Sequence, residues 1–188
     1  MTNLYKELPE NVKVFLKRGI LLLIGWLLFY HLLMKPANIP DRQLTEFTRY
    51  STVKFTALFY PNTQERMMFD SATHAMVPVI YINNVPCVQI SNPCNGLELY
   101  ALYLGILFCI PAPFRRFIKY AISGLIVIYI FNILRCAGLA IMAYHQSNLV
   151  DFAHHYAFKL IIYAVAFVFW AMYSKKDATP DEPATAAV

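Results

Sequence analysis

Apolar residues gather in four long runs, and most charged residues stand in the polar stretches between them. Each run approaches the roughly 20 residues with which an α-helix crosses about 30 Å of hydrocarbon. This pattern predicts an all-α membrane protein built on a four-transmembrane-helix bundle, with a small extracytoplasmic insert between the first two helices. The predicted spans cover residues 14–34, 93–110, 117–143 and 157–173.

Basic residues orient these spans, because Lys and Arg near span ends favour the cytoplasmic side of a membrane. They flank the first span, fill the connection between the second and third, and follow the fourth. We therefore predict that 1–13, 111–116 and 174–188 are cytoplasmic and that 35–92 and 144–156 are outside. The first span is interpreted as a retained anchor, because it has no clear small-residue cleavage site. The orienting residues are Lys6, Lys13, Lys17, Arg18, Arg115, Arg116, Lys119, Lys175 and Lys176.

The outer segment 35–92 has its own pattern and is expected to form a small cap on the bundle. Residues 41–56 are expected to begin with a short helix. The apolar runs 77–82 and 85–90 flank Asn83-Asn84, which predicts two short strands or a hairpin. A proline in each run would confine the strands to sheet edges.

Composition supports a membrane protein. Hydrophobic residues make up 59% of the 188 residues and charged residues 14%, whereas soluble domains carry about 25% charged residues. The net charge is +5, but the basic residues stand beside apolar runs, which indicates membrane orientation rather than nucleic-acid binding. The tail 177–188 is rich in Ala, Thr, Pro and Asp and is predicted to be disordered.

None of the four cysteines forms a C-x-x-C pair, which argues against zinc fingers and thioredoxin-like motifs. Cys109 and Cys136 fall inside apolar spans and are expected to be inert packing residues. Cys87 and Cys94 are both predicted outside, where an oxidising compartment would let them pair as a disulfide.

Cys94 is the first candidate for chemistry and lies in Ser91-Asn-Pro-Cys-Asn-Gly96. Ser91 or Asn92 followed by proline is typical of a helix start. Cys94 would then occupy the first helical turn, where unpaired N–H groups and the helix dipole favour a thiolate. Gly96 would leave room for a peptide backbone. The alternative is a small buried cysteine, or a half-cystine with Cys87.

Arg135 is the second candidate, since it lies within an apolar helix, three residues after Asn132. An arginine at mid-membrane costs roughly 2.5 kcal/mol or more, so it should face the bundle or a wet cavity. The alternative is a side chain that reaches the outer headgroups. Asn132 on the same helix face favours a polar interior site.

His154 and His155 open the fourth span. Imidazole transfers protons near neutral pH. Neighbouring helical residues point about 100° apart, so one of the two should face the site. The alternative is a polar collar at the interface. Glu98, one turn after Cys94, either pairs with Arg135 or lines a cavity.

These residues carry a resemblance to a known family. The chain resembles the exosortase/archaeosortase family of membrane cysteine transpeptidases, through Cys94-Asn-Gly96, Asn132-Ile-Leu-Arg135 and a histidine that opens the following span. The match covers about residues 91–170. The doubled histidine and aromatic-rich span look like short forms from Bacteroidetes-like bacteria.

The chain departs from the family pattern in two ways. It has fewer predicted spans than typical bacterial exosortases. Phe158 or Lys159 stands where a small residue often follows the histidine, so the pattern does not choose between His154 and His155.

The resemblance implies an activity at the outer face of a bacterial inner membrane. It implies that exported proteins lose a C-terminal sorting signal made of a short motif, a membrane helix and a basic tail. Cys94 would form a thioester, His154 or His155 would transfer protons, and Arg135 would stabilise the oxyanion or orient the thiolate. Water, or an amine on a surface glycan or lipid, would accept the product. No metal or organic cofactor is implied.

Two other functions are compatible with the sequence. A membrane thiol-disulfide oxidoreductase would use Cys87 and Cys94 in a reversible disulfide, although no quinone signature is present. A non-enzymatic scaffold would use segment 35–92 to bind a secretion or polysaccharide-assembly partner.

Overall fold

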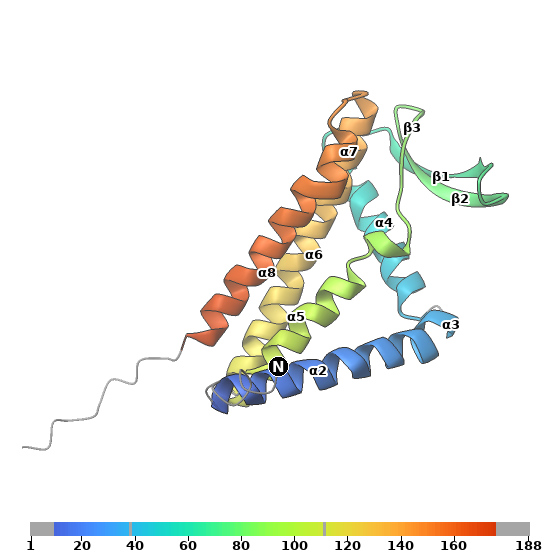
Figure 1. Cartoon of the computed structure of the whole chain (residues 1–188). Coiled ribbons are helices and arrows are strands. Elements are labelled where there is room, and N and C mark those ends of the chain that lie inside the picture. The colour runs from blue at the N-terminus through green and yellow to red at the C-terminus, as the bar shows by residue number, and fades with distance from the viewer. Residues whose placement is uncertain (1–9, 38, 111, 176–188) are drawn as a thin grey trace, which may run out of the picture.

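Figure 1 shows the computed structural model, which describes residues 10–37, 39–110 and 112–175. The predicted disorder of residues 177–188 concerns residues outside this part of the chain. In chain order, the elements are α2 (Glu10–Phe29), the π-helical turn η1 (Tyr30–Met34), α3 (Lys35–Ala37), α4 (Asp41–Ala57), the strands β1 (Thr63–Asp70), β2 (Ala75–Ile82) and β3 (Val85–Gln89), the 3₁₀ turn η2 (Asn92–Cys94), α5 (Leu97–Cys109), α6 (Phe114–Tyr144), α7 (Val150–Phe152), the π-helical turn η3 (Ala153–Ala157) and α8 (Phe158–Ser174).

Two helices in the described residues are long and apolar enough to cross a membrane. One is α6, with 31 residues, and the other is the continuous helix of 25 residues that α7, η3 and α8 form. They contain the predicted spans 117–143 and 157–173. The apolar helix α5 has 13 residues, or about 20 Å, which is shorter than the hydrocarbon layer. The count of four spans therefore stays a prediction.

Helix α6 is central to the bundle, and α4, α5 and α8 pack against it. Tyr103 and Leu107 of α5, Ile128 of α6 and Ile162 of α8 are buried in the core between these helices. Helix α2 contacts α5 and runs at a wide angle to α6 (Figure 1). Its large apolar side chains are mostly exposed.

A close contact in this core leads to a stability prediction. Gly124 of α6 lies against the ring of Tyr103, whose hydroxyl donates to the Tyr120 carbonyl oxygen (2.8 Å). A Cβ at position 124 would overlap that ring, and Tyr103 is only 2% exposed. We expect Gly124→Ala to lower the free energy of unfolding by about 1–3 kcal/mol, the usual cost of overpacking a core. Thermal unfolding of the detergent-purified protein measures this.

Gly105→Ala on α5 is the matched control, because no atom lies within 4 Å of the added Cβ. There the change should be neutral or slightly stabilising, since alanine favours helix more than glycine does. Equal destabilisation by both substitutions would contradict the packing argument.

The outer segment holds a three-stranded antiparallel sheet in the order β1-β2-β3. The chain is mostly helical, but this sheet corrects the all-α class. The expected runs 77–82 and 85–90 correspond to β2 and β3, joined by a turn in which Asn83 and Asn84 both have positive φ, as a tight hairpin turn requires. Strand β1 was not anticipated, because its polar sequence lacks an apolar alternation.

The edge position expected for both strands is wrong for β2, which is the middle strand. Its proline, Pro78, pairs with Met67 of β1, whereas β3 pairs with β2 only from Val79 onward. Pro78 therefore pairs with a strand on one side only. The N–H that proline lacks is not needed for a hydrogen bond to a second strand. Strand β3 does lie at an edge and holds Pro86.

Helix α4 contacts α6 and presents to the interior a face made of threonines. These residues recur every three or four positions, which places them on one side of a helix. Tyr129 of α6 donates a hydrogen bond to Ser51 (2.7 Å) and stacks on Phe47, which fixes α4 against the bundle. The buried threonines are Thr45, Thr48, Thr52 and Thr56.

Candidate active site

A cavity of about 470 Å³ lies among the ends of several helices and brings together residues that are distant in sequence. Asn132 and Arg135 reach it from α6, Gly96 and Glu98 from the start of α5, and Lys159 from α8. Four of these five, all except Lys159, are candidates from the sequence. Lys159 is an exposed lining residue of this cavity.

Arg135 is a buried charge in the cavity wall. Its side chain is buried, with 8% exposure, and its hydrogen bond is a long one from Nη1 to Asn132 Oδ1 (3.4 Å). Its Nε has no hydrogen-bond partner, and no carboxylate of the described residues lies within ion-pair distance. Glu98 lines the same cavity and is exposed. A buried cation without a counter-ion attracts an anion into the cavity.

The local structure around Cys94 differs from the prediction. Helix α5 begins at Leu97, so Cys94 lies in the preceding 3₁₀ turn, η2, and not in the first turn of α5. Its N–H is paired with the Ser91 carbonyl oxygen (2.8 Å). The predicted effect of unpaired helical N–H groups is therefore wrong for this residue. Gly96 has a φ of 82°, which lets the chain turn between η2 and α5 and disfavours any other residue there.

Asn132 links the Cys94 turn to Arg135. Its Nδ2 donates to the Cys94 carbonyl oxygen (3.0 Å), and its Oδ1 accepts the bond from Arg135. The Cys94 side chain is half-buried and packs against the cluster of Ile80, Ile90 and Cys136. Its chain neighbours Pro93 and Asn95 line the cavity, whereas Cys94 itself is not among the lining residues.

The two histidines have different surroundings. His154 is half-buried and close enough to Arg135 for their charges to interact. It also lines a second cavity of about 400 Å³, together with Cys87. The exposed His155 pairs through Nδ1 with the carboxylate of Asp151 (3.0 Å). Both lie in the π-helical turn η3, an irregularity that is frequent at functional sites.

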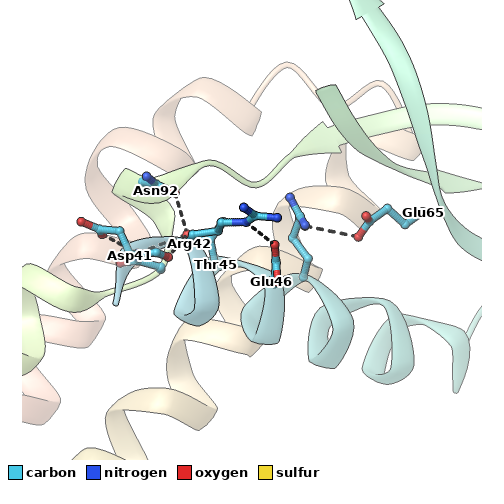
Figure 2. A network of polar contacts seen from close by, with 8 residues as sticks. Asp41, Arg42, Thr45, Glu46, Glu65 and Asn92 are labelled. Atoms are coloured by element: carbon cyan, nitrogen blue, oxygen red, sulfur yellow. Dashed lines mark hydrogen bonds and ion pairs between the residues drawn. The ribbon is translucent and has the colours of Figure 1, made fainter. Parts of the chain in front are cut away.

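A polar network next to Cys94 was not found from the sequence. Asp41 is 4% exposed and Asn95 is 1% exposed, and Asn95 Nδ2 donates to Asp41 Oδ1 (2.8 Å). Tyr30 donates to the other carboxylate oxygen (3.1 Å). Figure 2 shows Asp41 and Thr45 on α4 next to Asn92. Asn95 could have been noticed inside the Cys94–Gly96 motif, but nothing in the sequence linked it with Asp41, which is 54 residues away.

No group of three or more His, Cys, Asp or Glu side chains suitable for a metal ion occurs within the described ranges. The larger cavity is lined by cationic, amide and carboxylate side chains, and its cations are Lys35, Arg135 and Lys159.

Comparison with known proteins identifies the family of the chain. The family model described as transmembrane exosortase matches residues 14–172. The chain is also 30% identical over 152 residues to a protein named probable archaeosortase D from Methanocaldococcus jannaschii, a match that covers 79% of this chain and 82% of the relative. No solved structure matches.

The chain therefore belongs to the exosortase/archaeosortase family, and the resemblance derived from its motifs is confirmed. Its family consists of membrane proteins that resemble cysteine peptidases and act in protein sorting.

Proposed function

We propose that this protein is a membrane cysteine peptidase or transpeptidase that removes C-terminal sorting signals from exported proteins through a thioester. The observation that carries the proposal is the buried Arg135, which has no counter-ion among the described residues and is joined through Asn132 to the turn that holds Cys94. A cation placed in this way stabilises negative charge that develops near the thiol.

The reaction begins when the Cys94 thiolate attacks the scissile carbonyl carbon and forms a C–S bond. Arg135 stabilises the negative oxygen of the tetrahedral intermediate. His154 gives its proton to the leaving nitrogen as the C–N bond breaks, and the C-terminal segment departs as an amine. His154 then takes a proton from the acceptor, which attacks the thioester and restores the thiolate. The acceptor is water or an amine on a surface glycan or lipid.

The orientation follows from the charge pattern. With the termini in the cytoplasm, the Cys94 turn and the outer segment face the extracytoplasmic side of the inner membrane. A substrate with a short motif, a membrane helix and a basic tail would share this orientation. Its helix would lie in the bilayer beside the bundle, so that the motif reaches Cys94.

The proposal is tested by comparing C-terminal peptides of exported proteins from cells with and without this protein. We expect a set of proteins to keep a hydrophobic tail with basic residues at its end only in cells that lack the protein. Identical C-termini in both cell types would exclude the processing function.

The environments of the two histidines predict unequal roles. We expect His154→Ala to lower the rate of tail removal by about 100-fold or more, the usual contribution of a proton-transfer group. His155→Ala should change the rate by less than about 3-fold, because His155 is exposed and pairs with Asp151. The rate is measured from the fraction of substrate that has lost its tail over time.

Asp151→Asn is the matched control for His155, because it weakens the same exposed pair. Similar mild effects of both histidine substitutions would remove histidine from the mechanism.

The oxidoreductase alternative receives little support from the geometry. Cys87 and Cys94 are both free thiols. Cys87 lines the smaller cavity, whereas Cys94 packs against the cluster around Cys136. Burial raises the pKa of the Cys87 thiol, which disfavours the thiolate that disulfide exchange requires. A reversible Cys87–Cys94 disulfide found by differential alkylation would revive this alternative. The scaffold alternative requires that Cys94 can be replaced without effect.

A further inference from the structure

Helix α4 of the outer segment holds the residues on both sides of Cys94. Before Cys94, the Thr45 hydroxyl donates to Asn92 Oδ1 (2.9 Å). After Cys94, Asn95 Nδ2 donates to Asp41 Oδ1 (2.8 Å) and to the Asp41 carbonyl oxygen (3.2 Å). The turn is therefore tied to the first two turns of α4 by side chains that are mostly removed from water (Figure 2).

Asn95 also connects these contacts to the bundle. Its Oδ1 accepts a hydrogen bond from the Leu97 N–H (2.8 Å), the first residue of α5. From the opposite side, Asn132 of α6 holds the Cys94 carbonyl oxygen. The backbone of Cys94 is thus fixed between the outer segment and the helix that carries Arg135.

The burial of Asp41 is energetically unfavourable, so stability alone does not explain its position. It is 4% exposed and lies within ion-pair distance of no cation of the described residues. Its carboxylate accepts bonds from the neutral groups of Asn95 and Tyr30. A buried carboxylate without a neighbouring cation carries a large desolvation free energy. A pair of apolar residues would fill the same space without that penalty.

We propose that Asp41 is a positioning residue, which aligns the Cys94 thiol with Arg135 by fixing Asn95. This inference rests on the proposed function of Cys94. It makes the outer segment part of the active site, because the segment's helix α4 supplies the group that sets the position of the nucleophile. Displacement of a reacting group by about 1 Å is enough to lower a rate about 100-fold.

An exchange of the two side chains tests the alignment. Asn95→Asp would place two carboxylates against each other, and we expect tail removal to fall by about 100-fold. Adding Asp41→Asn would restore one carboxylate and one amide in the same contact. The double variant should recover to within about 5-fold of the wild-type rate. Failure of the folded double variant to recover would overturn the positioning role.

The second measurement needs no substrate. Alkylation of Cys94 by iodoacetamide is followed across pH in the detergent-purified full chain, with peptide mass spectrometry to assign the site. Removing the negative charge of Asp41 would by itself shift the reaction midpoint to lower pH. Loss of alignment with Arg135 would shift it to higher pH. We expect Asp41→Ala to raise the midpoint by about one pH unit.

Glu46→Ala is the matched control, because Glu46 lies on α4 and, within the described part of the chain, forms an ion pair with the exposed Arg42 alone (Figure 2). It should leave both measurements unchanged. A lower or unchanged midpoint in folded Asp41→Ala would overturn the positioning role, even if tail removal depends on Cys94. If tail removal does not depend on Cys94, the proposed function fails, and the alkylation midpoint still decides whether Asp41 positions the thiol.

Discussion

Cells that carry Cys94→Ala should accumulate exported proteins with their C-terminal sorting tails intact. Without the sulfur no thioester can form, and water alone would have to attack an unactivated amide. We expect the rate of tail removal to fall by at least about 1,000-fold, as happens when a catalytic nucleophile is removed. Pulse-labelled substrate, followed by the change in size on cleavage, measures the rate. Membrane insertion and thermal stability should remain close to wild type, because Cys94 is only half-buried.

Cys87→Ser provides the matched control for this substitution. Cys87 is also a free, partly buried cysteine of the outer segment, but it lies in β3 and lines the smaller cavity. Its replacement should leave tail removal within about 3-fold of wild type. Wild-type processing by Cys94→Ala would exclude the thioester mechanism. Equal losses in both variants would instead favour the disulfide function.

Arg135→Gln should abolish most of the activity while the protein still inserts into the membrane. Glutamine has a similar length and can keep a hydrogen bond with Asn132, but it removes the charge that faces the cavity. We expect a loss of about 100- to 1,000-fold, the range measured when one oxyanion-stabilising donor is removed. Arg135→Lys should recover only part of the rate, because an ammonium does not reproduce the planar fork of a guanidinium.

Arg49→Gln is the control for a general loss of positive charge. Arg49 is a largely buried arginine of α4, and it is neutralised by Glu65 (3.3 Å). It should affect stability more than processing. The role of Arg135 would be excluded if Arg135→Gln retained more than about a tenth of the wild-type rate.

The predictions for Cys94 and Arg135 depend on residues that the sequence alone already indicated as candidates. A cysteine, an arginine with a nearby asparagine, and a pair of histidines lie within or at the ends of apolar runs. Such residues are costly in a membrane unless they face one another or a wet cavity. Asn132 and Arg135 do line one cavity, together with Gly96 and Glu98, but Cys94 and the two histidines are not among its lining residues.

The sequence alone determined the membrane class, through its apolar runs, and the helices of the C-terminal half. It also contains the family motifs. Helix length and apolar character are local properties, and a span of hydrocarbon selects them without reference to other parts of the chain. The hairpin around Asn83-Asn84 was also found from the sequence, because its turn requires residues that tolerate positive φ.

Only the tertiary structure decided the details of the site. The start of α5 at Leu97 depends on Asn95, whose side chain accepts the first N–H of that helix and is held by Asp41, far away in sequence. The different surroundings of His154 and His155 depend on a π-helical turn and on the location of Arg135. Such features arise from contacts between distant segments, where packing and the pairing of buried polar groups override local preference.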